Sequence, residues 1–409
     1  MTRRGTTSRG WATLALGALC LVVAIVFGSH ALYPLGFGLV LVVLMARAWL
    51  GLALRRPHVR RRRPVQDLTE GDDAHVELLV DSGSVVPLPA ALAEELPGNL
   101  GTRTVELRRA GAGSYWAEYV LHGVPRGRHA FAPVRISVAD PFGLAEGSAT
   151  LREEDALVVY PRLTDLGRLF FDGGGVAGDG RRLLLRRPAG FELHRVREHQ
   201  QGESLRRVHW PSTAHRGALM VKELHDAPRD ELVVVLDGDS SGPAGALPDP
   251  AFDAAVRAAG SIVLAQARRG RRCVLALNSR RRETQAVMSE GPEWHRCLEL
   301  LAAAEPDARL PVTALLAAGA GAAGRALQLV VVTMRITPEL AHRLIERMLS
   351  RRPSALVHVD AASFAGRAPS REPGLLRLAA AGVPVAVVRQ GDDLAEVLAG
   401  RPAVEAARA

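Results

Sequence analysis

Lysine, cysteine and aromatic residues are scarce in this chain of 409 residues. Lys222 is the single lysine, so arginine carries almost all of the positive charge. Alanine and glycine are abundant beside it, which indicates a bias of the coding sequence rather than a functional choice. The three cysteines, Cys20, Cys273 and Cys297, show no CxxC spacing and no disulfide framework, so we expect reduced, buried thiols.

Acidic residues are absent from residues 1–64, which contain ten arginines. The whole chain has 52 Lys and Arg against 43 Asp and Glu, a net charge of +9. Without the ten N-terminal arginines, 42 basic residues face 43 acidic ones, so the rest of the chain is close to neutral. The basicity therefore belongs to the N-terminal segment, and we expect no nucleic acid partner.

Two long apolar runs occupy this N-terminal segment. Residues 11–27 carry no charge, and residues 32–54 carry only Arg47. Each run is long enough to cross about 30 Å of hydrocarbon, and the short break between them predicts a transmembrane helical hairpin within residues 1–64. A cleaved signal peptide would explain the basic start and the first run, but not the second run and the arginines after it.

Arginines lie on both flanks of the two runs, whereas the turn between the runs contains neither Arg nor Lys. The positive-inside rule therefore places both ends of the hairpin in the cytoplasm. We expect a two-span protein of the plasma membrane whose soluble domains are cytoplasmic.

Short β-rich segments, separated by Gly and Pro, fill residues 65–166 and predict a β-sandwich-like domain. Residues 167–187 are rich in Gly and Arg and predict a flexible linker. A phosphate-binding loop would end in Gly-Lys-Ser or Gly-Lys-Thr, which this segment lacks.

Apolar strand candidates alternate with helical periods over residues 231–409. Examples are the apolar run 232–236, the helical period 252–268 and the apolar run 273–277. Continuous apolar strands separated by helices predict an α/β domain with a parallel sheet that is covered on both faces.

The segment 188–230, between the two expected domains, combines charged residues and histidines in a specific pattern. The pattern consists of Glu192, Arg197, Glu198, Gly202, Glu203, Arg206, Trp210, Ala214 and Lys222. This signature resembles that of the bacterial membrane-anchored family of domain of unknown function 58. Departures from it are His199, Glu203, His209 and His215, where the family has Tyr, Asp, Asp and Arg. The upstream segment Asp140-Pro141-Phe142-Gly143-Leu144 also resembles the family.

The resemblance implies that the C-terminal domain is von Willebrand factor type A-like, a Rossmann-like fold. Such domains often bind Mg²⁺ through Asp-x-Ser-x-Ser after the first strand, with a later Thr and Asp. Here Asp237 and Ser241 match, Asp239 replaces the middle Ser, and Thr333-Met334-Arg335 stands where the later Asp is expected. No partner Thr is identified, so both a weak Mg²⁺ site and a vestigial loop remain open.

Five histidines, at 194, 199, 209, 215 and 225, fall within the signature segment. A zinc site needs three or four of them to converge, and neither HExxH nor paired i, i+4 spacing is present. We therefore interpret them as hydrogen-bonding surface residues. A Gly-x-Ser-x-Gly nucleophile elbow is also absent from the sequence.

The leading functional hypothesis is a membrane-tethered, non-enzymatic interaction or adaptor protein. The resemblance implies work beside a MoxR-type AAA+ ATPase in assembly or maturation of other proteins. Arg197, Glu198, Arg206 and Trp210 then form either a partner-facing surface or a network that locks the two domains together. The alternatives are a membrane-bound metal-dependent hydrolase and a structural component of the cell envelope.

Overall fold

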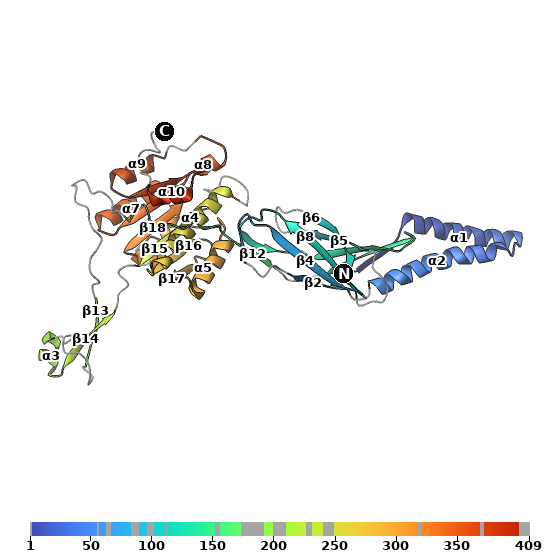
Figure 1. The fold of residues 1–409 in the computed structure, drawn as a ribbon, viewed down its shortest axis with the longest axis horizontal. Coiled ribbons are helices and arrows are strands. Elements are labelled where there is room, and N and C mark those ends of the chain that lie inside the picture. Colours follow the sequence, from blue (N-terminus) through green and yellow to red (C-terminus); the bar gives the residue numbers. More distant parts are fainter. Residues whose placement is uncertain are drawn as a thin grey trace. The chain divides into compact units, whose positions relative to one another are not determined.

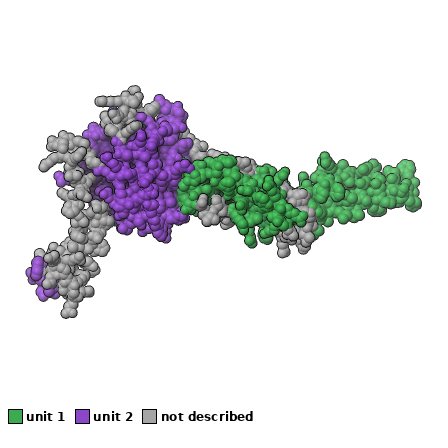
Figure 2. Space-filling view, viewed as in Figure 1, with its two compact units in different colours: residues 1–160 green, residues 161–409 purple. Residues whose placement is uncertain are grey.

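The structure is a computed structural model. It describes residues 2–54, 57–62, 67–82, 90–95, 102–111, 113–131, 133–151, 156–172, 192–198, 210–225, 231–239, 249–317, 321–368 and 372–400. The chain divides into two compact units, residues 1–160 and residues 161–409 (Figure 2). Each unit is described in turn.

Two apolar helices, α1 (Ser8–Phe27) and α2 (Leu32–Ala53), form an antiparallel hairpin in the first unit (Figure 1). The Thr7 side chain caps α1 by accepting a hydrogen bond from the Gly10 amide, and Gly28 ends the helix in the left-handed region at φ 66°. The helices approach closely at Gly17 and Gly36, where an added Cβ would lie 3.2 Å and 2.7 Å from the facing helix. Both helices are long and apolar enough to cross a membrane, as judged by length and composition.

Two antiparallel sheets form the β part of the first unit. One contains β1 (Thr2–Thr6), β11 (Ala145–Leu151), β10 (Val134–Ala139), β5 (Ala90–Glu95) and β6 (Thr102–Glu106), in that order. The other contains β2 (His58–Arg62), β4 (Ala74–Asp81), β8 (Ser114–Leu121) and β7 (Arg108–Arg109). A smaller sheet contains β3 (Leu68–Thr69), β12 (Ala156–Tyr160) and β9 (Gly127–Ala130). Alternate residues of β4, β8 and β10 are buried in one shared core, as the period-2 pattern requires.

The helical hairpin is built into this β fold rather than preceding it. β1 pairs with β11 and β2 pairs with β4, so the chain enters α1 from one sheet and leaves α2 into the other. Arg60, Arg61 and Arg62, expected as a membrane flank, lie in β2, and the buried Arg61 guanidinium stacks on Phe131 at 4.5 Å. A separate segment 1–64 is therefore not what the structure shows, because its two ends are strands whose hydrogen-bond partners come much later in the sequence.

A six-stranded sheet is the centre of the second unit. Its order is β17 (Thr284–Val287), β16 (Cys273–Asn278), β15 (Leu232–Asp237), β18 (Gln328–Thr333), β19 (Ser354–Val359) and β20 (Val385–Val388). All neighbours are parallel except β17, which pairs antiparallel at the edge. The prediction of a parallel α/β sheet is confirmed.

Helices cover both faces of this sheet (Figure 1). One face packs against α4 (Pro250–Arg268), α5 (Pro292–Ala303), α8 (Ala361–Phe364) and α10 (Leu394–Ala399). The other packs against α6 (Gly321–Arg325), α7 (Pro338–Leu349), α9 (Pro373–Ala380) and the 3₁₀ turn Val312–Ala314. Alternate residues of β15 enter the two cores, which is why the strand reads as a continuous apolar run.

Cys273 and Cys297 are buried free thiols in the first of these cores. Burial raises the pKa of the Cys297 thiol to about 12 and also raises that of Cys273. Both thiols therefore stay protonated. Their burial agrees with the expectation from the sequence, whereas Cys20 on α1 is only partly buried.

Residues 161–172 belong to the second unit, although the sequence suggested a boundary at 166 and a linker from 167. Leu163 packs on Gly260 of α4, and the Thr164 amide donates to Ser261 Oγ at 3.0 Å. Asp172 accepts from Arg269 at 3.0 Å. These contacts fix the segment to the α/β core, whereas residues 173–187 of the expected linker lie outside the described residues.

Candidate functional site

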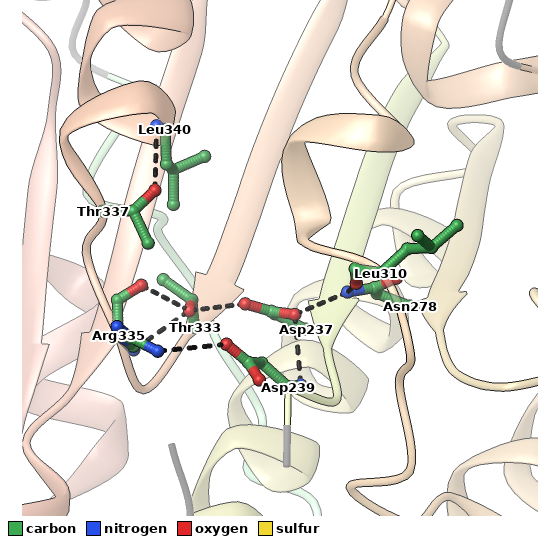
Figure 3. A network of polar contacts seen from close by, with 8 residues as sticks. All are labelled: Asp237, Asp239, Asn278, Leu310, Thr333, Arg335, Thr337 and Leu340. Atoms are coloured by element: carbon green, nitrogen blue, oxygen red, sulfur yellow. Dashed lines mark hydrogen bonds and ion pairs between the residues drawn. The ribbon is translucent and has the colours of Figure 1, made fainter. Parts of the chain in front are cut away.

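Asp237 ends β15 at the carboxyl edge of the parallel sheet and is 3% exposed. Its Oδ1 accepts from the Asn278 Nδ2 at 2.8 Å and from the Asp239 amide at 3.2 Å. Its Oδ2 lies 2.8 Å from the Thr333 hydroxyl (Figure 3). The three strand ends of β15, β16 and β18 thus meet on one carboxylate, because parallel strands bring their carboxyl ends to the same edge.

Neighbouring groups saturate this network. The second Asn278 Nδ2 hydrogen is directed to the Leu310 carbonyl at 3.1 Å. Thr333 Oγ1 accepts from the Arg335 amide at 3.1 Å and lies 2.9 Å from the Arg335 carbonyl. Each described donor and acceptor around Asp237 therefore already has a partner from the protein.

The Thr333 hydroxyl has a single proton but two acceptors, Asp237 Oδ2 and the Arg335 carbonyl. The Thr333 proton can be shared between the two acceptors in a three-centre bond. A protonated Asp237 would instead donate to the hydroxyl oxygen and leave the Thr333 proton for the Arg335 carbonyl. Burial raises the pKa of Asp237, against the opposing effect of hydrogen bonds from Asn278 and Thr333. Burial thus favours the neutral acid, and the geometry is compatible with it.

Asp239 lies beside this network, two residues further along the chain. Its Oδ2 lies 3.9 Å from Arg335 Nη1, with both side chains partly exposed (Figure 3). The Arg335 guanidinium therefore supplies a positive charge to the carboxylate that the sequence suggested as a cation ligand. Ser241, the other expected ligand, lies outside the described residues.

These residues do not fit a Mg²⁺ site as they stand. Mg²⁺ takes near-octahedral oxygen ligands, whereas Asp237 faces the NH₂ group of Asn278 and Asp239 faces a guanidinium. Within the described ranges no group of three or more His, Cys, Asp or Glu is placed to hold a metal ion. The sequence analysis identified no threonine partner of Asp237, and in the structure the hydroxyl of Thr333 contacts it.

A second buried polar group, His358, lies one strand further along the sheet edge. Its backbone is in register with Thr333 of β18 and Val387 of β20. Burial lowers the pKa of His358 to about 4, partly offset by Asp360 and by the Thr333 backbone. Asp360 is buried and lies 4.0 Å from Arg389 Nε. This group could not be found from the sequence, because a single His in an apolar strand matches no motif.

The signature residues fall partly on a two-stranded sheet. β13 (Glu192–Glu198) pairs antiparallel with β14 (Met220–His225), which places Arg197 opposite Val221 and Glu198 opposite Met220. Lys222 pairs with Val196, and Glu192 pairs with His225. The strand hairpin therefore brings together backbone positions that are separated by more than twenty residues in the chain.

Helix α3 (Trp210–Arg216) lies between these strands in the sequence and contacts β14. The Met220 amide donates to Thr213 Oγ1 at 3.0 Å, and Met220 is buried. Trp210 is 66% exposed, and Ala214 and His215 are also exposed. Gly202, Glu203, Arg206, His199 and His209 lie outside the described residues.

Comparison with known proteins places this region in a family context. Residues 195–360 match the family model described as "Protein of unknown function DUF58". The matched interval contains β14, α3, the Asp237 network and His358. The match thus supports the resemblance of the signature segment on the part of the chain where that segment lies.

One curated relative is the "Uncharacterized protein YeaD" of Bacillus subtilis (strain 168), which is 27% identical over 228 residues. The aligned region covers 55% of this chain and 54% of that protein, so the chain spans about half of the relative's length. Among solved structures, "Crystal structure of BslA - A bacterial hydrophobin" matches with 15% identity and a TM-score of 0.16. That match covers 24% of this chain and 98% of the other, and its score carries no argument about the fold.

Proposed function

We propose that the protein is a membrane-tethered, non-enzymatic interaction or adaptor protein. The α1–α2 hairpin is the tether, and the second unit is a von Willebrand factor type A-like recognition domain at the cytoplasmic face. The partner is a MoxR-type AAA+ ATPase that works in assembly or maturation of other proteins. The apolar hairpin and the DUF58 match support this proposal.

The chemistry of the sheet edge supports a binding role rather than catalysis. In the described part of the network, the Asp237 carboxylate is shielded from solvent and engaged by Asn278, Asp239 and Thr333. A general acid or base needs an exchangeable proton within reach of a substrate. A buried acid with three internal hydrogen-bond partners instead stabilises the contacts between the strand ends that it joins.

The strand order and the position of Asp237 support the type A-like interpretation. The strand that ends at Asp237 lies centrally, between β16 and β18, and loops follow it at the carboxyl edge where open α/β sheets bind ligands. The Asp239–Arg335 pair replaces the cation that such domains often hold at this edge. The Arg335 guanidinium therefore supplies the positive charge at this edge of the sheet.

The observation that carries the proposal is the exposure of Trp210 at the start of α3. A tryptophan that is 66% exposed leaves a large apolar surface in water, and tryptophans are frequent anchors of protein interfaces. Within its own segment Trp210 therefore has a large apolar surface available for a partner. We therefore place the partner contact on the signature segment around Trp210.

The test compares Trp210→Ala with Leu376→Ala, because Leu376 has the same exposed fraction of 66% but lies on α9. Each variant is used to capture the ATPase from membranes with and without ATP. Trp210→Ala should abolish capture while changing the free energy of unfolding by less than about 0.5 kcal/mol. Leu376→Ala should retain capture. A Trp210→Ala protein that is destabilised by about 3–5 kcal/mol would instead support the structural role.

A further inference from the structure

The turn between β10 and β11 presents an exposed aromatic side chain on a rigid backbone. Phe142 is 72% exposed, whereas Asp140 is 4% exposed. The Asp140 carboxylate accepts from the amides of Phe142 and Ala145, and Gly143 provides the left-handed conformation at φ 68°. The turn is thus fixed by internal hydrogen bonds while its largest apolar side chain faces solvent.

This turn is bonded to the base of α1. The Thr7 amide donates to the Leu144 carbonyl at 3.0 Å, and the Thr7 hydroxyl donates to the Gly143 carbonyl at 2.7 Å. Gly10 packs so closely on Leu144 that an added Cβ would lie 2.1 Å from its carbonyl oxygen. Phe142 is therefore held at the level where the apolar helix begins.

The uncharged apolar length above that level lies at the short end of the range that spans a bilayer, although both whole helices are long enough to cross one. Residues 11–27 of α1 span about 25 Å, and residues 32–46 of α2 span about 22 Å. The hydrocarbon layer is about 30 Å thick. Arg47 marks the polar end of the span, because its guanidinium donates to Thr6 Oγ1 at 2.6 Å.

α2 cannot slide further into the bilayer to make up the difference. Its last turns, with Leu50, Ala53 and Leu54, belong to the same buried cluster as β4, β8 and β10. Local thinning of the bilayer can meet part of the difference of about 5–8 Å, and entry of the end of the β fold that holds this turn into the interfacial layer meets the rest.

We propose that the Phe142 turn is a third membrane contact, which inserts at the headgroup boundary of an anionic bilayer. The exposed Arg9 and Arg47 beside it bind lipid phosphates. The Asp140 carboxylate is buried and accepts two backbone hydrogen bonds, so it does not face the lipid. The first exposed carboxylate after it is Glu146 on β11. This inference rests on the proposed tether, and it adds that the β fold is held against the bilayer by three elements.

The experiment uses the full chain in lipid nanodiscs, with Cys20 replaced by Ala and single cysteines labelled with an environment-sensitive fluorophore. Cys273 and Cys297 are buried and escape labelling. The test position is Phe142→Cys, and the quencher is a lipid that carries a spin label near its headgroup. The control is His122→Cys. Ser114, at the start of β8, pairs with Asp81 of β4, which in turn pairs with His58 shortly after α2. His122 follows the other end of β8, away from the helical hairpin.

The label at 142 should lose about half of its emission, since interfacial groups lie within ~5–10 Å of the headgroup boundary. The label at 122 should keep its emission. Quenching at 142 should be stronger in discs that contain phosphatidylglycerol than in pure phosphatidylcholine, and equal quenching would overturn the role of Arg9 and Arg47.

A third label at Leu41→Cys, on an exposed position of α2, reports insertion of the hairpin through quenching by lipids brominated on their acyl chains. Quenching at 41 without quenching at 142 overturns the Phe142 contact and leaves the tether intact. Loss of quenching at 41 overturns the tether itself. The two failures are therefore distinct.

Discussion

At the scale of single residues, the carboxyl edge of the sheet depends on how Asn278 and Thr333 hold the buried side chain of Asp237. A carboxylate after an apolar run is visible as a pattern along the chain. Asn278 and Thr333 contact Asp237 only because β16 and β18 flank β15, and strand order is not encoded in local spacing. His358 was also missed because its neighbours depend on strand order, since β18 and β20 flank β19.

Replacing Asp237 by Asn tests whether the buried acid is neutral. An Asn there accepts from Asn278 and the Asp239 amide through its oxygen and donates to Thr333 through its nitrogen, as the protonated acid does. We expect the free energy of unfolding at pH 7 to change by less than about 1 kcal/mol or to rise. Asp237→Ala should lower it by about 2–3 kcal/mol, because it leaves buried donors unpaired.

The stability of both variants is measured in the full-length protein, through the protection of the β15 and β18 amides from hydrogen exchange. The pKa of Asp237 is raised, so ionisation disfavours the folded state as pH rises from the unfolded value of 3.8 through the folded one. A strong loss of protection in Asp237→Asn at pH 7 would contradict the neutral acid.

Titration of His358 predicts a dependence of stability on pH whose sign is opposite to that of Asp237. Its folded pKa of about 4 lies below the unfolded value of 6.5, so the unfolded chain binds more protons between these values. Stability should therefore fall as pH falls from 6.5 towards 4, by at most about 3 kcal/mol.

The measurement is the exchange protection of β19 in wild type and His358→Gln at several pH values. The difference between the two proteins removes the contribution of Asp237, which both retain. An unchanged slope in the variant would show that His358 is not the titrating group.

At the scale of elements, the apolar helices and the parallel sheet were predictable, and the way that the hairpin joins the β fold was not. Long apolar runs and helical periods are local signals. The pairing of β1 with β11 joins residues more than a hundred positions apart, so the local sequence around Thr2–Thr6 does not predict a strand. Residues 161–166 were assigned to the β-rich domain and residues 167–172 to the linker for a similar reason, since the contacts of this segment are with α4 and the residue after it.

Two glycines of α2 test the packing of the hairpin. An Ala Cβ at Gly36 would lie 2.7 Å from Leu21 Cγ, whereas nothing lies within 4 Å of one at Gly38. Gly38→Ala should stabilise α2 by up to about 1 kcal/mol through helix propensity. Gly36→Ala should lose this gain and lower the Tm in detergent micelles. Equal Tm values for the two variants would show that the helices do not pack at Gly36.

At the scale of the whole molecule, the chain consists of two units with different composition and architecture. The first unit contains the apolar hairpin and a β fold built around its base, and the second contains the DUF58-matching sheet with a closed polar edge. The sequence predicted separate apolar, β-rich and α/β segments because charge, periodicity and Gly content change along the chain, whereas the structure joins the first two in one unit that ends at residue 160. It could not predict what Trp210 contacts, because exposure depends on the folded neighbours of α3.

The central claim is that the hairpin crosses the membrane and holds the second unit in the cytoplasm. Arginines flank the hairpin on both sides, and its turn contains no basic residue except His30. The most direct measurement labels single cysteines in intact cells with a membrane-impermeant maleimide, in a protein whose Cys20 is replaced by Ala. One cysteine replaces Ser29 in the turn, and the other replaces Leu349, which is 79% exposed on α7. We expect labelling at position 29 and none at position 349 until the cells are lysed, whereas labelling at position 349 alone would place the second unit outside and contradict the account.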